Sequence, residues 1–343
     1  MMKSSEQWDD GPGPTTPGER PLRGWLDVHA HYTTEHYGQA CEASGHGQPD
    51  GMPGLPQWSS DAALELMAQT GTAAAVLSIS SPGVHFGDAS PAADAAARDL
   101  AAHVNDSGAA MVARRPDRFG LSAVLPLPDV DGALAELTRA YDELGADAVA
   151  LLTNYHGRYL SDPVFAPVLA ELDARGSVVT LHPTSPPGWE GTALGRPRPM
   201  IEFPFDTTRC VVDLALSGTL AAYPGIRWII PHAGAVLPAL AHRVTVLSLL
   251  TGEPTDFPAV LSGLYYDLAG TPLPVAVDGL LAVATPDRLL YGSDFPFTPA
   301  PAVGHLAGEL RRSPALRDAC FDLDSGSPAA ELFPRLVKSP RDS

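Results

Sequence analysis

The chain has 343 residues, of which 45% are hydrophobic, so it is long enough to bury a full core in one domain. Lys and Arg number 22 against 40 Asp and Glu, which gives a formal net charge of −18 at pH 7. Nucleic acids and anionic membrane surfaces attract basic patches, so this charge balance argues against both as partners.

Residues 1–20 are polar and rich in Gly and Pro, and they contain no apolar segment of the kind that export signals carry. We expect a disordered tail there, a single domain over 21–337 and a second tail over 338–343. No apolar run approaches the ~18 residues of a membrane span. The three cysteines, Cys41, Cys210 and Cys320, are far apart and fit no zinc-ligand spacing. These features predict a cytoplasmic protein.

In chain order, short β-rich apolar runs alternate with stretches of helical period. The predicted strands are Trp25–His29, Ala74–Ile79, Phe119–Leu125, Ala148–Leu152, Val178–Leu181, Ile226–Ile230, Leu264–Leu268 and Leu289–Tyr291. The predicted helices between them include Asp61–Gln69, Ala92–Arg114, Gly132–Leu144, Val164–Arg175, Thr207–Ala222 and Leu237–Leu250. This alternation indicates βαβ units and a parallel sheet.

Eight strands in this length favour a closed (β/α)₈ barrel of the TIM type. The competing fold, an open doubly wound sheet, is disfavoured because no Gly-rich dinucleotide loop follows the first strand. The segment Tyr32–Trp58 holds too much Gly and Pro for one helix. We therefore predict a long first βα loop that covers the mouth of the barrel.

Several predicted strands end in residues that bind metals, at the end of the barrel where chemistry gathers. His29 and His31 end the first strand, His182 the fifth, His232 the sixth, and Asp294 follows the eighth. Residues i and i+2 of an extended strand point to the same side, so both His29 and His31 can face the barrel axis. Together, His29, His31, His182 and Asp294 predict a site for one divalent cation, with Zn²⁺ the first choice and Mn²⁺ the alternative.

Each of these residues has a plainer interpretation when taken alone. A single His-X-His is weak support, His182 could be a hydrogen-bonded core imidazole, and Asp294 could cap a helix. The joint occurrence of all four at strand ends favours the metal site. For the remaining histidines a structural role is the better interpretation, with His36 and His156 the least certain.

The motifs around these residues resemble the amidohydrolase superfamily. Within it they are similar to the branch of decarboxylases that act on aminocarboxymuconate semialdehyde, resorcylate and methylsalicylate. The resemblance runs from about Trp25 to Phe297 and is carried by Asp27–His31 (DVHAH), Leu181–Pro183 (LHP), Pro231–Pro238 (PHAGAVLP) and Tyr291–Phe297 (YGSDFPF). Ser78–Gly83, Leu151–Tyr155 and Glu202–Arg209 look most like the methylsalicylate decarboxylases.

The resemblance implies roles for individual residues. His29, His31, His182 and Asp294 match the metal ligands, and His232 matches a histidine that works in acid/base catalysis. Arg243 matches an arginine that holds the substrate carboxylate across a dimer interface, which implies a homodimer. A salt bridge on a helix face is nearly as good an interpretation of Arg243, and the same holds for Arg209, a second candidate cation. Tyr32, Trp189, Phe295 and Phe297 could line an apolar wall or simply pack.

Hydrolases of this superfamily carry a carboxylated lysine at the end of the fourth strand, where this chain reads Leu151–Asn154 (LLTN). The resemblance therefore implies one ion and non-oxidative decarboxylation of a small aromatic or dienoic carboxylic acid. The ion would act as a Lewis acid, and His232 or Asp294 would deliver the proton to the carbon that bears the carboxylate. Hydrolysis of a lactone or amide by metal-activated water, with His232 as base, is the alternative. A non-catalytic metal-binding protein is disfavoured, because His232 beside the ligands has no evident structural use.

Overall fold

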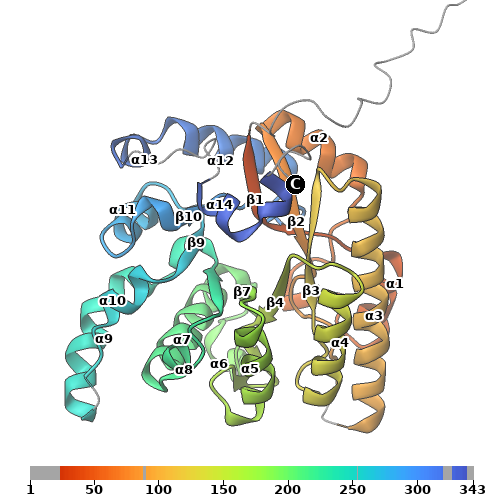
Figure 1. The fold of residues 1–343 in the computed structure, drawn as a ribbon, viewed down its shortest axis with the longest axis horizontal. Helices are drawn as coiled ribbons and strands as arrows, with labels where there is room; N and C mark the ends of the chain where they lie inside the picture. The colour runs from red at the N-terminus through yellow and green to blue at the C-terminus, as the bar shows by residue number, and fades with distance from the viewer. Residues whose placement is uncertain (1–23, 88–89, 253, 320–326, 338–343) are drawn as a thin grey trace, which may run out of the picture.

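The structure is a computed structural model that describes residues 24–87, 90–252, 254–319 and 327–337 (Figure 1). The tails predicted at 1–20 and 338–343 lie outside the described residues, and so does Cys320. Cys41 and Cys210 are both buried free thiols. No helix in the described part of the chain is both long and apolar enough to cross a membrane.

Eight parallel strands form the centre of the molecule, as the sequence predicted. Their order around the sheet is β1-β2-β3-β4-β7-β8-β9-β10. The ring is closed by a parallel bridge between Asp27 and Tyr291 and by a hydrogen bond of 2.9 Å from the Val28 amide to the Tyr291 carbonyl. Helices lie around the outside of the strands (Figure 1). The predicted (β/α)₈ barrel is therefore confirmed.

The barrel strands are short, and two more strands form a separate antiparallel hairpin after β4. The strands are β1 (Trp25–His31), β2 (Thr72–Ser78), β3 (Phe119–Val124), β4 (Ala148–Leu152), β5 (Asn154–Tyr155), β6 (Arg158–Tyr159), β7 (Val178–His182), β8 (Arg227–Ile230), β9 (Tyr265–Asp267) and β10 (Leu289–Leu290).

The helices follow the strands in sequence, with short 3₁₀ turns between them. The α-helices are α1 (Glu35–Ala43), α2 (Ser60–Thr70), α3 (Pro91–Arg114), α4 (Val130–Asp142), α5 (Ala166–Ala174), α6 (Trp189–Thr192), α7 (Glu202–Leu216), α8 (Thr219–Ala222), α9 (Leu237–Thr251), α10 (Phe257–Ser262), α11 (Val275–Leu281), α12 (Ala300–Arg312), α13 (Pro314–Asp318), α14 (Ser327–Leu332) and α15 (Pro334–Val337). The 3₁₀ turns are η1 (Pro49–Gly51), η2 (Pro163–Phe165), η3 (Arg198–Met200), η4 (His232–Gly234) and η5 (Pro286–Arg288).

One helix differs clearly from its predicted bounds. Instead of spanning Thr207–Ala222, α7 begins five residues earlier, at Glu202. Pro204 falls in its first turn, where a missing amide proton costs nothing. A left-handed glycine, Gly218 (φ 77°), then separates α7 from α8.

The segment Tyr32–Trp58 is only partly the irregular loop that the sequence predicted. It contains the nine-residue helix α1 and the turn η1. The Thr34 side chain caps α1 by accepting a hydrogen bond from the Tyr37 amide, and Tyr37 and Cys41 bury one face of the helix. Gly and Pro break the helical pattern only after α1 ends, and from there the chain runs beside the mouth of the barrel.

The two ends of the barrel are built differently. At the amino-terminal end, α14 and α15 pack Ala329, Leu332, Phe333 and Leu336 against strand residues in one buried cluster. Arg335 fixes this cap by donating to the Phe119 carbonyl and to the Asp147 carboxylate. The opposite end, where the strands finish, remains open to a cavity that contains the predicted site.

Candidate metal centre and cavity

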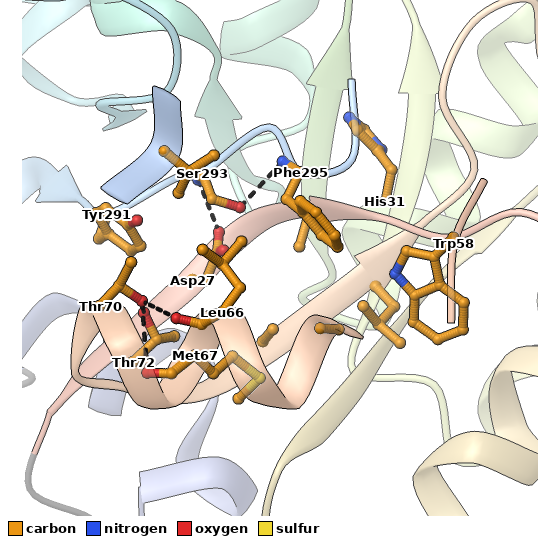
Figure 2. Close-up of a pocket in the computed structure, with 15 residues that line it drawn as sticks. Asp27, His31, Trp58, Leu66, Met67, Thr70, Thr72, Tyr291, Ser293 and Phe295 are labelled. Carbon is orange, nitrogen blue, oxygen red and sulfur yellow. Dashed lines mark hydrogen bonds between the residues drawn. The ribbon is translucent and has the colours of Figure 1, made fainter. Parts of the chain in front are cut away.

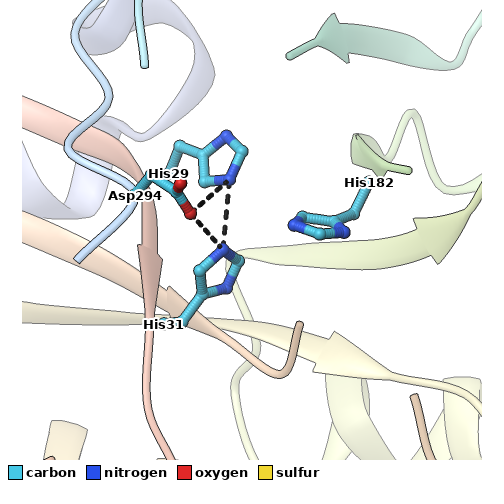
Figure 3. A group of neighbouring side chains, drawn as sticks. All are labelled: His29, His31, His182 and Asp294. Atoms are coloured by element: carbon cyan, nitrogen blue, oxygen red, sulfur yellow. Dashed lines mark hydrogen bonds and ion pairs between the residues drawn. The ribbon is translucent and has the colours of Figure 1, made fainter. Parts of the chain in front are cut away.

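The four predicted ligands come together at the carboxyl ends of β1, β7 and β10, although 265 positions separate the first from the last (294 − 29). Each offers a ligand atom, and these atoms all lie within 4.8 Å of one another. His29 Nε2 and His31 Nε2 are 3.1 Å apart, and Asp294 Oδ1 lies 3.3 Å from His31 Nε2 and 3.7 Å from His29 Nε2. Figure 3 shows the imidazoles and the carboxylate converging on one point.

The other nitrogen of each imidazole is already engaged. His29 Nδ1 lies 2.8 Å from Asp267 Oδ2, and His182 Nδ1 lies 2.7 Å from the Pro183 carbonyl. His31 Nδ1 lies 2.9 Å from Ser78 Oγ, whose own proton goes to the Ala30 carbonyl. Because these partners accept hydrogen bonds, they hold the proton on Nδ1 and leave the Nε2 lone pairs facing inward.

This donor set fits a divalent cation. Ligands bound at about 2.0–2.1 Å in a tetrahedron lie roughly 3.3 Å apart, close to the separations among His29, His31 and Asp294. Two buried Nε2 atoms 3.1 Å apart need a metal ion or a shared proton between them, because two bare lone pairs at this distance repel each other. The residues present therefore suit a metal of the kind the sequence predicted.

The charges at the centre also attract a cation. Burial disfavours the charged form of His29, but the Asp267 and Asp294 carboxylates outweigh it and raise the pKa of His29 to about 9. Burial alone would raise the pKa of Asp294, yet His31 and the nearby imidazoles hold it well below its usual range. Burial lowers the pKa of His31 and of His182. Asp294 is therefore ionised, and His29 takes up positive charge as a proton when no metal is bound.

His232 lies beside the ligands in the turn η4 that follows β8. Its ring centroid is 5.1 Å from that of His29, and its backbone amide donates to Asp267 Oδ1 at 3.0 Å. Burial lowers the pKa of the His232 imidazole. His232 and Asp294 both have positive φ, at 56° and 57°. Non-glycine residues in this conformation are strained, and such strain clusters at functional sites.

Two of the four ligands, His182 and Asp294, line a cavity of about 450 Å³, which is large enough for a small aromatic acid. His182, His232 and Asp294 line it, with Phe297 among the apolar residues on its walls. No lysine or arginine within the described ranges lines this cavity. The rest of its lining comprises Pro49, Asp50, Met52, Ser80, Ser81, Pro199, Met200, Phe203, Pro204, Ala235, Val236, Ala269, Gly270, Thr271, Pro272, Ala276 and Thr298.

Of the four predicted substrate-binding residues, the structure brings only Phe297 to the cavity, with its ring 5.4 Å from that of His31. Arg209 instead binds Asp206, a fully buried carboxylate on the same helix, and the Tyr159 hydroxyl. Trp189 lies under the Arg198 guanidinium at 3.9 Å. Arg243 is exposed on α9. Arg209 and Trp189 are therefore committed to contacts within the fold.

A second, much smaller cavity of about 20 Å³ lies behind the metal ligands, between β1, β2 and α2 (Figure 2). Asp27, Thr70, Tyr291 and Phe295 are among its lining residues. Asp27 accepts hydrogen bonds from the backbone amides of His29 and Ser293, which ties β1 to the segment that carries Asp294. This space holds at most one water molecule, so its lining supports the ligands and binds no substrate.

The polar residues of the site that the sequence interpretation missed include Asp267, Ser78 and Asp50. Asp267 and Ser78 orient the ligand imidazoles, and Asp50 lines the cavity. Asp267 and Ser78 each lie one residue before the end of a predicted strand, and that position was the available signal. Asp50 sits in a Gly- and Pro-rich segment whose path only the folded chain defines.

A closed parallel barrel with three histidines and one aspartate at its strand ends defines a class of metal-dependent enzymes. Residues 26–322 match the amidohydrolase family model, so the chain belongs to that family. It is 35% identical over 319 residues to the 6-methylsalicylic acid decarboxylase of Penicillium expansum, covering 91% of this chain and 96% of the relative.

Solved structures agree with this assignment. One amidohydrolase structure has a TM-score of 0.83 at 33% identity, over 91% of this chain and all of the other. The 5-carboxyvanillate decarboxylase of Novosphingobium aromaticivorans, crystallised with manganese, has a TM-score of 0.76 at 19% identity, over 91% and 96% of the two chains. The family match and the similarity to the 6-methylsalicylic acid decarboxylase confirm the predicted membership of the decarboxylase branch, and the solved structures agree with its fold.

Proposed function

We propose that this protein is a metal-dependent, non-oxidative decarboxylase of a small aromatic acid of the salicylate type. The observation that carries the reaction class is the near full-length match to a 6-methylsalicylic acid decarboxylase. It supports the predicted decarboxylation over hydrolysis. The end of β4 also supports decarboxylation. The hydrolases carry their carboxylated lysine in this stretch, whereas this chain has Thr153, whose buried hydroxyl donates to Asp206.

We propose His29, His31, His182 and Asp294 as the ligands of one divalent cation. The imidazole-rich set suits Zn²⁺, and the manganese of the 5-carboxyvanillate decarboxylase structure supports Mn²⁺. When bound, the ion would act as a Lewis acid toward the substrate carboxylate and the neighbouring phenolic oxygen.

The chain's own residues would then move one proton. In the reaction, the ring carbon that bears the carboxylate gains a proton, the bond to the carboxylate breaks, and its electron pair returns to the ring as CO₂ leaves. His232, beside the ligands at the cavity wall, is placed to hold that proton on an imidazole nitrogen. Asp294 is proposed together with His232 as a group that delivers this proton to the ring carbon. Phe297 and Phe203 would keep water from the ring by covering it with apolar surface.

A homodimer is part of the proposal, with Arg243 of one copy reaching the substrate carboxylate in the other. Arg243 is exposed and makes no ion pair with any described residue. The same helix, α9, exposes Val246, Leu247, Leu249 and Leu250. An exposed apolar face of this kind is typical of an interface and supports the dimer. Among the described residues, no lysine or arginine lines the cavity.

We further propose one domain over 21–337 and a cytoplasmic location. The unbroken barrel supports the first, and the buried free thiols of Cys41 and Cys210 support the second.

The test is CO₂ release from salicylate, 6-methylsalicylate and 2,6-dihydroxybenzoate, with lactones and amides assayed in parallel. We expect release from at least one of these acids, loss after chelation, and recovery when Zn²⁺ or Mn²⁺ is added back. Activity that survives complete chelation would refute the metal. Turnover of a lactone without CO₂ release from any acid would refute the decarboxylase.

A further inference from the structure

Among the described residues that line the cavity, Asp50 is the acidic residue other than the proposed ligand Asp294. It belongs to η1, in the segment between β1 and α2, and it lines the cavity together with its neighbours Pro49 and Met52. Its side chain is buried, and its backbone has a left-handed φ of 54°. The fold therefore places a carboxylate at the rim of the site on a constrained turn.

The contacts of Asp50 leave it uncompensated by a direct ion pair. Its Oδ1 accepts a hydrogen bond of 2.5 Å from the Ser185 hydroxyl. Ser185 in turn accepts from Arg198 Nε at 3.0 Å, while the Arg198 guanidinium stacks on Trp189. No ion pair within 4.0 Å joins Asp50 to a lysine or arginine in the part of the chain that the structure describes, although the Asp50 carboxylate and the Arg198 guanidinium interact electrostatically. Arg198 is thus linked to Asp50 through the Ser185 hydroxyl, and its charge partly screens the carboxylate.

From this arrangement we infer that Asp50 is a specificity-determining residue, which rejects substrates that carry a second carboxylate. The inference rests on the proposed function and narrows its substrate class to aromatic monocarboxylates. One carboxylate is accommodated at the ligand end. In the proposed dimer Arg243 of the other copy is taken by that first carboxylate. A second carboxylate would meet no lysine or arginine among the described residues that line the cavity, and it would face the Asp50 charge.

The expected size of this effect follows from Coulomb's law. Like charges about 5 Å apart near a protein surface repel strongly enough to weaken binding by roughly 100-fold, and partial screening by Arg198 reduces this toward 10-fold. An uncharged group of the same size escapes the penalty. A carboxamide in place of the second carboxylate is therefore the matched ligand.

The hydrogen bond from Ser185 to Asp50, called the latch below, also holds the loop that carries Asp50. The variants must therefore separate the effect of the Asp50 charge from that of the latch. Asp50→Asn removes the charge, keeps an oxygen that can accept from Ser185, and tolerates the left-handed backbone. Ser185→Ala breaks the latch and keeps the charge. One substitution therefore removes the charge and keeps the hydrogen bond, and the other removes the hydrogen bond and keeps the charge.

The experiment measures dissociation constants on the metal-loaded full chain, from tryptophan fluorescence within the first turnover. The ligands are salicylates with a carboxylate or a carboxamide at ring position 3, 4 or 5. For the wild type we expect the carboxamide to bind 10- to 100-fold more tightly than the carboxylate at one or more positions. Asp50→Asn should reduce that ratio to within about threefold, and Ser185→Ala should leave it unchanged.

Equal binding of carboxylate and carboxamide by the wild type would overturn the inference. So would a ratio that Ser185→Ala reduces as much as Asp50→Asn, since Asp50 would then act only as a latch. CO₂ release, assayed on the same samples, tests the proposed function separately. A protein that discriminates in binding but releases no CO₂ refutes the decarboxylase and leaves the charge selection standing.

Discussion

The inner end of the cavity and its rim are built on opposite principles. At the inner end, His29, His31 and His182 are buried, and each ring is fixed by a partner on Nδ1. At the rim, Met200 is 63% exposed, and the turn that carries Asp50 is held by hydrogen bonds among side chains. In the proposed reaction, the residues at the strand ends bind the metal and carry out the chemistry, whereas the loop that carries Asp50 selects the substrate. Substitutions at the inner end should abolish the reaction, and those at the rim should redirect it.

The largest effect should follow removal of a ligand. His31→Ala removes an inward Nε2 and leaves Asp294 without its nearest imidazole. The amount of bound metal should therefore fall, and kcat should fall by at least ~10³-fold. Metal content by mass spectrometry and CO₂ release measure this. His305→Ala is the control, because His305 is exposed on α12. Full metal content in His31→Ala would disprove its role as a ligand.

An intermediate loss of metal affinity is expected for Asp267, which contacts the ligand His29. Asp267→Asn weakens the orientation of His29 and the hold on the His232 amide, and such outer partners typically contribute 10- to 100-fold to metal affinity or activity. A competition titration with a chelator measures the affinity. Asp278→Asn, on the exposed side of α11, should leave it unchanged. An unaltered affinity in Asp267→Asn would show that the strands alone orient His29.

Substitutions on the outer helix α9 should separate dimer assembly from catalysis. Leu250 is 81% exposed on α9, so Leu250→Glu should halve the mass measured by light scattering if α9 forms the dimer interface. Arg243→Ala should keep the dimer but raise KM about tenfold, because a charge-assisted hydrogen bond to the substrate carboxylate is lost. Arg312→Ala is the matched exposed control. A KM that does not change would exclude Arg243 from the site.

The smallest effect concerns the barrel wall. Asp129 caps α4 through the Gly132 amide and pairs with Arg98, whose hydrogen bond holds the pKa of Asp129 below its usual 3.8. Asp129→Ala should lower the free energy of unfolding by about 1 kcal/mol, and Asp129→Asn by less because it retains a cap. Urea unfolding measures both.

The pH dependence of this contribution has a definite sign. A carboxyl whose pKa is lowered in the folded state stabilises the protein above its unfolded pKa and loses that contribution as pH falls through the folded value. The difference between wild type and Asp129→Asn should therefore be complete near neutral pH and shrink below pH 3.8. Neither substitution should alter kcat. A change in kcat would show that the wall and the centre are coupled.

Local sequence pattern was enough for the barrel and for the four candidate ligands. Strands and helices bury apolar residues at different periods, so Ala148–Leu152 could be predicted with its exact bounds. His29 and His31 lie two residues apart on one strand, and parallel strands end together, so strand-end position alone grouped them with His182 and Asp294.

Only the tertiary structure determined which residues contact the ligands and which line the cavity. Asp267 orients His29 from 238 residues away, and Arg209 is bound by Asp206 instead of facing the cavity. Thr34 starts a helix in a segment that composition assigned to a loop, and the chain after it carries Asp50 to the rim. Periodicity reports which face of an element is buried, because burial acts on each element by itself. Which polar groups meet depends on the path of the whole chain, and no local pattern encodes that path.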